Sequence, residues 1–264
     1  MKRKNHQNPQ RKKLNRKKPV IALAQIRYFD ISEKNNVEKI KRYIRQAKKA
    51  NADIICFPES CIHKTETLYF NDTLIREIRE ECKKNEIWCI ITEDLEIKGK
   101  RYNVSMLIDR EGEIKGGYRK IHLYGEKVNP GRKIKVFKTD FAKIGIVICW
   151  DLAFPELFKR YKDAGAQIVF CPAQWWYDTK AHDEKHEQRE MKILESLVIA
   201  RAFENVYFVA LCNPVMESKY QISYSAIASP TKILKKIAGK QGMIISQISL
   251  NEIEKVQKIY DSQT

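Results

Sequence analysis

The amino-acid sequence predicts an α/β fold, on three observations. Short apolar runs rich in β-branched residues, such as Val20–Ile26 and Ile144–Ile148, are typical of buried strands. Segments with apolar residues at helical spacing alternate with these runs; in Ser32–Asn51 lysines and arginines occupy the other face. Several neighbouring strands are joined by short turns, which favours a mixed sheet, or a pair of sheets, with helices outside.

The expected elements follow one another as short segments divided by turn signals. Glu111-Gly112 marks a hairpin turn, and Pro155 opens a helix, where the N–H that proline lacks is not needed. The expected strands are Pro19–Tyr28, Asp53–Glu59, Ile87–Asp94, Tyr102–Asp109, Glu113–Lys120, Lys143–Asp151, Gln167–Ala173, Val206–Asn213, Tyr224–Ser229 and Met243–Leu250. The expected helices are Ser32–Asn51, Leu68–Asn85, Pro155–Gly165 and Asp183–Asn205, and His122–Lys135 is expected to be a loop.

No internal linker rich in proline, glycine or serine interrupts this pattern, so residues 19–264 are predicted to form a single domain. The chain has 264 residues, 43% of them hydrophobic, which is enough for a substantial core. Its net charge is +17, and nine lysines and arginines lie within Met1–Lys18, which has no acidic residue. We expect this segment to be a disordered basic tail that contacts nucleic acid at most non-specifically.

The seven cysteines predict free thiols in a reducing, cytoplasmic setting. Their number is odd and no pair has C-x-x-C spacing, so a disulfide framework or a zinc site is not expected. No apolar run approaches the ~20 residues of a membrane span. Val20–Ile26 is short and lacks a small-residue cleavage signal after it, so it is interpreted as a strand and not as a signal peptide.

Three strand ends carry polar residues that suit nucleophilic catalysis. Glu59 and Lys120 each follow a strand, and Cys149 lies at a strand-to-helix turn that would present its sulfur outward. A thiol needs an activating neighbour, a carboxylate can take its proton, and an ammonium can stabilise a tetrahedral intermediate. Each residue alone also fits a structural role: a buried cysteine, a helix-capping glutamate or a surface lysine.

Five motifs stand in order along the chain, and the first three are the most specific. They are Phe57-Pro58-Glu59, Tyr118–Leu123, Gly145–Asp151 with Phe154-Pro155-Glu156, Cys171-Pro172-Ala173 and Ala200–Asn205. In order and spacing this set resembles the nitrilase superfamily of carbon–nitrogen hydrolases. The resemblance covers roughly Val20 to Leu250, so that the two ends of the chain lie outside it.

The resemblance implies a four-layer α-β-β-α sandwich and a catalytic triad of Glu59, Lys120 and Cys149. It implies a second glutamate, for which Glu126 is the matching position in a slightly shortened loop. It also implies an oxyanion held by Lys120 and the backbone N–H of Trp150, and neither a metal nor an organic cofactor. Members usually dimerise, partly through the helix that here ends in Ala200–Asn205, so a homodimer or a higher homo-oligomer is expected.

The activity implied is that of an amidohydrolase acting on a small linear amide or N-carbamoyl amine through a thioester. Cys149-Trp150-Asp151 lacks the Cys-Trp-Glu of nitrile hydrolysers. ω-Amidases typically place a carboxylate-gripping arginine where this chain has Ala153, so neutral or cationic amides are expected to be preferred, unless a residue such as Arg132 or Lys180 replaces that arginine. The candidate substrate-binding residues are Tyr124, Gln174, Trp175 and Trp176, and the tryptophans also fit core or dimer packing.

Three alternatives remain open at this point. A nitrile hydrolyser would use the same triad. In an acyltransferase of the amidase fold, an amine would replace water as the acceptor. A non-catalytic protein that associates with nucleic acid, or a scaffold, is supported only by the basic tail and the high net charge.

Overall fold

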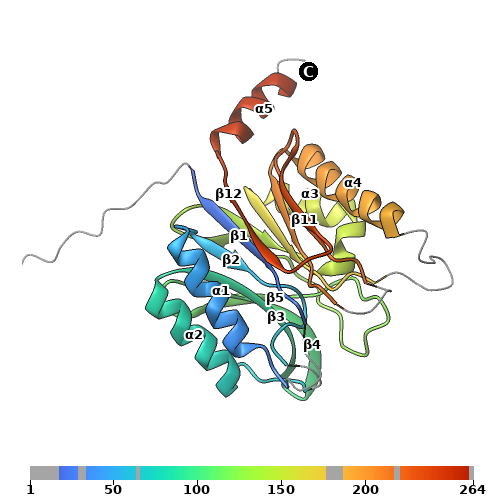
Figure 1. The fold of residues 1–264 in the computed structure, drawn as a ribbon. Coiled ribbons are helices and arrows are strands. Elements are labelled where there is room, and N and C mark those ends of the chain that lie inside the picture. The colour runs from blue at the N-terminus through green and yellow to red at the C-terminus, as the bar shows by residue number, and fades with distance from the viewer. Residues whose placement is uncertain (1–17, 29–33, 64–65, 177–186, 217–220, 262–264) are drawn as a thin grey trace, which may run out of the picture.

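Two six-stranded sheets pack face to face, and helices cover the outer face of each sheet (Figure 1). The computed structural model describes residues 18–28, 34–63, 66–176, 187–216 and 221–261. Lys180, the expected helix start at Asp183 and the basic tail, apart from Lys18, lie outside these ranges. The α-β-β-α order of layers confirms the expected four-layer sandwich.

The first sheet has the strand order β12-β1-β2-β3-β4-β5. Its first three strands in the chain run parallel, and the other pairings are antiparallel. Helices α1 (Val37–Lys49) and α2 (Thr73–Asn85) cover its outer face. The strands are β1 (Val20–Gln25), β2 (Ile54–Cys56), β3 (Trp88–Ile97), β4 (Lys100–Ile108), β5 (Ile114–Arg119) and β12 (Gly242–Gln247).

Strand β1 is apolar from Val20 to Ala24 because both of its faces are covered. Ile21 and Leu23 belong to the core between the two sheets, whereas Ala22 and Ala24 belong to the core beneath α1 and α2. A strand buried on both faces has a continuous apolar run and no polar alternation. The apolar face of α1 that the sequence predicts lies in the second of these cores, with Val37, Ile40, Ile44 and Ala47.

The second sheet has the strand order β11-β10-β9-β8-β7-β6, with β7, β8 and β9 parallel. Helices α3 (Pro155–Asp163) and α4 (Glu187–Asn205) lie on its outer face. Position 145 in β7 requires a glycine because the Tyr161 ring of α3 packs against its backbone. A Cβ atom there would lie 2.5 Å from that ring. The strands are β6 (Phe137–Lys138), β7 (Lys143–Ile146), β8 (Ile168–Pro172), β9 (Phe208–Cys212), β10 (Tyr224–Ala228) and β11 (Ile233–Ala238).

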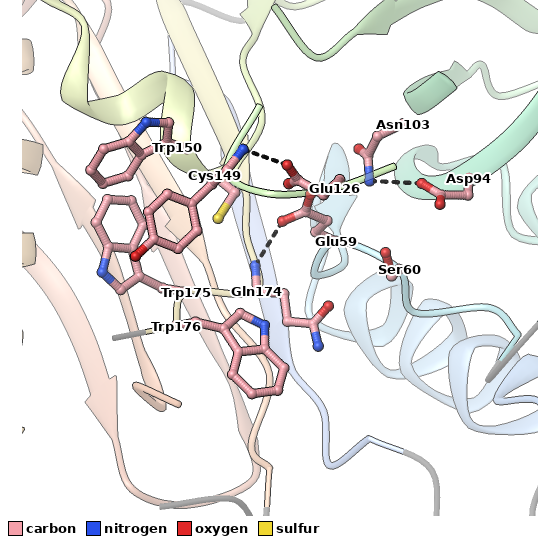
Figure 2. Close-up of a pocket in the computed structure, with 11 residues that line it drawn as sticks. Glu59, Ser60, Asp94, Asn103, Glu126, Cys149, Trp150, Gln174, Trp175 and Trp176 are labelled. Carbon is pink, nitrogen blue, oxygen red and sulfur yellow. Dashed lines mark hydrogen bonds between the residues drawn. The ribbon is translucent and has the colours of Figure 1, made fainter. Parts of the chain in front are cut away.

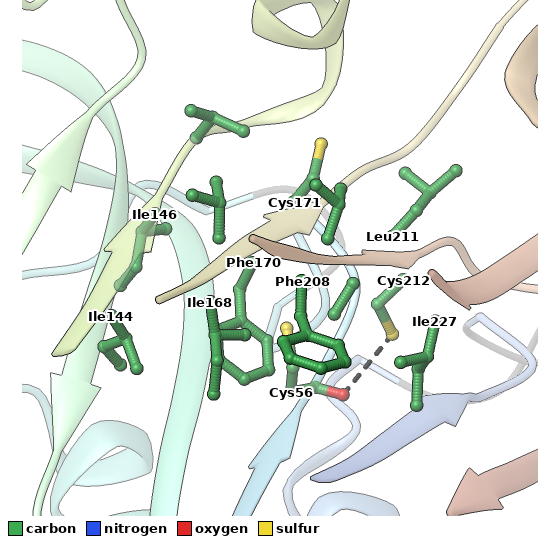
Figure 3. Close-up of a cluster of buried hydrophobic side chains, with 14 of the residues drawn as sticks. Cys56, Ile144, Ile146, Ile168, Phe170, Cys171, Phe208, Leu211, Cys212 and Ile227 are labelled. Carbon is green, nitrogen blue, oxygen red and sulfur yellow. Dashed lines mark hydrogen bonds between the residues drawn. The ribbon is translucent and has the colours of Figure 1, made fainter. Parts of the chain in front are cut away.

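The core between the sheets joins segments that are far apart in the sequence. Figure 3 shows apolar side chains of β7, β8 and β9 gathered near Cys56 of the first sheet. The Cys212 thiol of the second sheet donates a weak hydrogen bond to the Cys56 carbonyl oxygen at 3.3 Å. All seven cysteines are free, as the sequence predicts, and all seven are buried.

Some elements differ from those expected from the sequence. The expected strand Lys143–Asp151 ends at Ile146, and β6, β11 and the C-terminal helix α5 (Asn251–Asp261) were not predicted. Strand β11 is an edge strand whose Lys235 and Lys236 are exposed, so it has no apolar run to reveal it. In the described ranges, no helix combines the length and the apolar character needed to cross a membrane.

Candidate active site

Cys149 begins a tight turn between β7 and α3. The chain leaves β7 at Ile146 and enters a 3-10 turn, η1 (Cys149–Ala153), before α3 starts at Pro155. The φ angle of Cys149 is +47°, a left-handed conformation that costs a non-glycine residue roughly 1–3 kcal/mol. The cysteine thus lies at a strand-to-helix turn, as the sequence predicts, but on a turn whose strain other contacts must offset.

Asp151 is the side chain that holds this turn in place. It is fully buried and accepts hydrogen bonds from the backbone N–H of Ile148 at 3.0 Å and of His122 at 2.8 Å. The Tyr118 hydroxyl donates a third hydrogen bond at 2.7 Å. A carboxylate with this many donors is strongly stabilised, so Asp151 ties the nucleophile turn to the segment that follows β5.

Arg201 of α4 holds the other end of the turn. Its guanidinium donates to the carbonyl oxygens of Leu152 at 3.1 Å and Ala153 at 3.3 Å. Arg201 is itself buried and also pairs with Glu204 at 3.3 Å. The Ala200–Asn205 motif therefore supports the turn from the helix layer.

Lys120 lies between two glutamates. Its Nζ atom is 2.9 Å from Oε1 of Glu59 and also contacts Oε1 of Glu126. The other oxygen of Glu59 accepts the backbone N–H of Gln174 at 3.1 Å, and that of Glu126 accepts the N–H of Tyr124 (Figure 2). Lys120 is only 1% exposed, so this ion pair network is shielded from solvent.

Burial and charge set the protonation of the four groups. Burial raises the pKa of Glu59, and the positive charge of Lys120 offsets this only in part. Burial, followed by the negative charge of Glu59, raises the pKa of the Cys149 thiol well above its usual range. Burial alone would lower the pKa of Lys120, but the surrounding negative groups outweigh it and raise that pKa. For Glu126 the nearby Lys120 outweighs burial and lowers the pKa. A neutral thiol therefore lies beside a carboxylate that can accept its proton.

These groups surround a cavity of about 140 Å³ (Figure 2). Glu59, Glu126 and Cys149 line it, and Lys120 contacts both glutamates without lining it. The remaining residues predicted from the sequence also line the cavity: Tyr124, Trp150, Gln174, Trp175 and Trp176. The structure thus brings together all the residues that the sequence analysis assigned to the site.

The tryptophans and Tyr124 form an aromatic wall on one side of this cavity. The rings of Trp150 and Trp175 lie 5.6 Å apart, and those of Tyr124 and Trp150 lie 4.8 Å apart. Trp175 is 5% exposed, whereas Trp176 is 44% exposed. Trp175 therefore packs in the core, as one of the two expectations from the sequence had it. Trp175 and Trp176 also line the cavity.

Three lining residues were missed by the sequence analysis: Ser60, Asp94 and Asn103. Asp94 in β3 and Asn103 in β4 are directly opposite each other in the antiparallel pair. The Asn103 Nδ2 atom donates to Oδ1 of Asp94 at 3.1 Å. The available signal was Asn103, a polar residue directly before the apolar end of β4. Nothing in the sequence indicated that it lies near Cys149 in the folded chain.

Of the two basic residues considered from the sequence, Arg132 does not line this cavity, and Lys180 lies outside the described residues. Ala153 is not a lining residue, and Arg132 lines a separate cavity with Arg119 and Lys133. Of the residues described, no Lys or Arg lines the cavity beside Cys149. Nor do they include a group of three or more His, Cys, Asp or Glu side chains placed to hold a metal ion.

A buried cysteine, two glutamates and a lysine around one cavity, carried on a four-layer sandwich, form the arrangement expected of a nucleophilic hydrolase. The sequence profile of the carbon–nitrogen hydrolase family matches residues 20–258. Omega-amidase NIT2 of Mus musculus is 26% identical over 265 aligned positions, gaps included, and the match covers 90% of this chain and 91% of that protein. Nitrilase homolog 2 of Dictyostelium discoideum is 28% identical over 253 residues, with 86% and 74% covered.

Solved structures show the same fold. An amidase from Nesterenkonia sp. superposes with a TM-score of 0.76 at 19% identity, and the match covers 93% of this chain and 96% of that chain. The chain belongs to the carbon–nitrogen hydrolase family. It is therefore an enzyme, which removes the alternative of a non-catalytic protein.

Proposed function

We propose that this enzyme is a cysteine-dependent amidohydrolase that cleaves a non-peptide C–N bond of a small linear amide or N-carbamoyl amine and releases ammonia. The observation that carries the proposal is the convergence of Cys149, Glu59 and Lys120 at one small cavity from three separate strand ends. The relatives named omega-amidase support action on amides. Variants of the Nesterenkonia amidase solved with acrylamide and with butyramide support small substrates.

In the proposed acylation step, Glu59 accepts the thiol proton while the Cys149 sulfur attacks the carbonyl or carbamoyl carbon. The raised pKa of the thiol, to which burial and the negative charge of Glu59 contribute, supports proton transfer within the pair over a standing thiolate. Lys120 uses two of its three N–H bonds for Glu59 and Glu126, which leaves one for the substrate oxygen. That N–H and the backbone N–H of Trp150 stabilise the oxyanion.

Collapse of the tetrahedral intermediate releases ammonia, which takes its proton from the Glu59 acid, and leaves a thioester on Cys149. Glu59 then removes a proton from water as the water oxygen attacks the thioester. The acid product leaves, a carbamic acid in the case of a carbamoyl substrate, and the thiol recovers its proton. Glu126 orients Lys120 and the loop at Tyr124, since it contacts both. The scheme needs no cofactor.

The lining of the cavity supports a neutral or cationic substrate over a dicarboxylate monoamide. The charged side chains among the described lining residues are the carboxylates of Glu59, Asp94 and Glu126. The aromatic wall adds ring faces, which attract cations. This argument takes the place of the one from Ala153, which lies away from the lining.

Two alternatives within the same chemistry stay open. A nitrile could add to the same thiol, and an amine could replace water as the acceptor of the acyl group. Both would keep the roles of Glu59, Lys120 and Cys149. Product analysis separates them. A nitrile hydrolyser forms a carboxylic acid when a nitrile is the only substrate supplied, and an acyltransferase forms a new amide when an amine is added.

We also propose that residues 19–264 form a single domain and that the enzyme is a cytoplasmic homodimer. Large apolar side chains are exposed on α4 and α5, where the rings of Phe203 and Tyr260 lie 5.7 Å apart. Ile193 and Ile259 are exposed on the same two helices. Grouped apolar side chains of this size are typical of interfaces, and the seven free thiols suit a reducing compartment.

Ammonia release from a panel of primary amides, N-carbamoyl amines and nitriles tests the proposed function. We expect at least one amide or carbamoyl amine to be hydrolysed, and Cys149→Ala to abolish turnover without loss of helix content by circular dichroism. Cys82→Ala, which removes a buried thiol of α2, is the matched control and should retain activity. Near wild-type turnover by Cys149→Ala would overturn the proposal.

A further inference from the structure

One polar atom beside the active-site cavity lacks a partner. Asn103 lines the cavity and is 3% exposed, yet its Oδ1 atom accepts no hydrogen bond from the described part of the chain. Buried side-chain acceptors are nearly always hydrogen-bonded, so an exception in a cavity wall leaves a place for a donor that a water molecule or a ligand brings.

The orientation of the Asn103 amide follows from its neighbour. The Nδ2 atom donates to Oδ1 of Asp94 at 3.1 Å, and the Asp94 carboxylate also pairs with Arg101 at 3.2 Å. The reversed amide would bring two acceptor oxygens together. The unpartnered atom is therefore the oxygen, and only a hydrogen-bond donor can satisfy it.

Asp94 adds negative charge at the same end of the cavity. Figure 2 shows Asp94 and Asn103 across Glu59 and Glu126 from Cys149 and the aromatic wall. Asp94 also lines a neighbouring cavity of about 410 Å³, as Ser60 and Gln174 do, so the two cavities meet there. Lys120 compensates the two glutamates, whereas the partner of Asp94 is the half-exposed Arg101.

We propose that Asp94 and Asn103 form a subsite for an ammonium group of the substrate, and that the enzyme prefers ω-amino amides or their N-carbamoyl counterparts. An ammonium group brings both the donor that Asn103 Oδ1 lacks and a positive charge for Asp94. A carboxylate at the same place would meet two acceptors. This inference rests on the proposed function, because it names the substrate class of the same site.

Three amides of similar length test the subsite: γ-aminobutyramide, valeramide, in which a methyl group replaces the ammonium, and succinamic acid. The values of kcat/KM are compared at about 0.15 M salt, where long-range steering is weak. We expect the wild-type enzyme to prefer γ-aminobutyramide over the other two by roughly tenfold or more, as loss of a charge-assisted hydrogen bond predicts.

The variants Asp94→Asn and Asn103→Leu separate recognition from folding. Each should lower kcat/KM for γ-aminobutyramide by about tenfold while changing it less than about threefold for valeramide, whose turnover reports an intact catalytic site. Arg101→Gln removes the competing cation and should leave the preference for γ-aminobutyramide equal or larger. Equal losses on γ-aminobutyramide and valeramide, or a wild-type preference for succinamic acid, would overturn the subsite.

A binding measurement keeps the test independent of turnover. Calorimetry of the Cys149→Ala protein with γ-aminobutyramide should show binding that weakens by roughly tenfold when Asp94→Asn is added. If the wild-type enzyme hydrolyses valeramide as well as γ-aminobutyramide and this binding is absent, the subsite is wrong and the proposed function stands. If Cys149→Ala keeps full turnover, the proposed function fails, and the binding result still decides the subsite.

Discussion

Lys120 fixes the charge balance of the site. An ammonium buried to this degree would lose its proton in an apolar environment, because desolvation disfavours the charged form. Glu59 and Glu126 reverse this and raise the pKa of Lys120. A permanent positive charge therefore lies next to Glu59, where an oxyanion formed on the substrate could use it.

We predict that Glu126→Gln shifts the acidic limb of the kcat/KM profile to lower pH. Glu59 must be ionised to accept the thiol proton, so activity falls as pH decreases through its pKa, which is raised by burial. The negative charge of Glu126 contributes to this rise, and its removal lowers the pKa of Glu59. We also expect kcat/KM to fall by roughly 10²-fold, because Lys120 loses one of the two groups that position it.

Glu113→Gln is the control for this measurement. Glu113 pairs with Arg79 at 2.9 Å on the surface, so its removal should leave both the limb and the rate unchanged. The pH profile of initial rates between about pH 4 and 9 covers the ionisation of an ordinary or raised carboxyl group. An acidic limb that moves to higher pH in Glu126→Gln would contradict the assignment of the limb to Glu59.

Single site residues could be predicted where a residue with a reactive or charged side chain directly follows an apolar run. Glu59, Lys120 and Cys149 each follow a strand, so their positions were visible in the sequence. Asp94 and Asn103 lie inside strands and meet only through the register of β3 against β4. That register is a property of the folded hairpin, which is why sequence reasoning did not connect them to the site.

At the level of elements, η1 depends on Asp151 more than on its own backbone. The turn starts at a residue with a positive φ angle, and Asp151 accepts hydrogen bonds from Ile148, directly before the turn, and from His122, in the segment that follows β5. A neutral amide in its place would present an NH₂ group to at least one of these donors. The turn would then lose the contacts that hold Cys149 toward the cavity.

We therefore predict that Asp151→Asn lowers the free energy of unfolding by about 2 kcal/mol or more, since a buried N–H group loses its acceptor. The melting temperature should fall by roughly 4–8 °C for a chain of this size. We also expect kcat to fall by about tenfold or more. Asp163→Asn is the control, because Asp163 pairs with Lys159 at 3.1 Å on an exposed helix face and should change the melting temperature very little. Equal effects of the two variants would contradict the role of Asp151.

The two strands that the sequence missed lack an apolar pattern of their own. β6 has two residues, and β11 is an edge strand with exposed lysines, so neither forms a buried run. The strand expected at Lys143–Asp151 was too long because its apolar run continues past β7 to Ile148. Periodicity could not show where the backbone leaves the sheet, since Val147 and Ile148 are as deeply buried as the strand itself.

The two sheets of the whole molecule assemble a site that neither sheet contains alone. The first sheet supplies Glu59, Lys120 and Asn103, and the second supplies Cys149 and Gln174. The backbone N–H of Glu59 donates to the Ala173 carbonyl oxygen at 3.3 Å, which joins the two sheets directly at the cavity. The sequence predicted the layers through family resemblance, but the packing of one sheet on the other has no local signal.

The basic tail should be dispensable for both catalysis and assembly. The described residues that line the cavity lie between Glu59 and Trp176, and the exposed apolar side chains proposed for the dimer lie on α4 and α5. We predict that deletion of Met1–Lys18 changes kcat/KM by less than about threefold with a neutral amide, and leaves the mass of a dimer in light scattering. The neutral amide matters, because the nine positive charges of the tail could alter the encounter rate of a charged substrate. A loss beyond tenfold, equivalent to about 1.4 kcal/mol of transition-state stabilisation, would mean that the tail contacts the site. A monomeric mass would mean that it takes part in the interface.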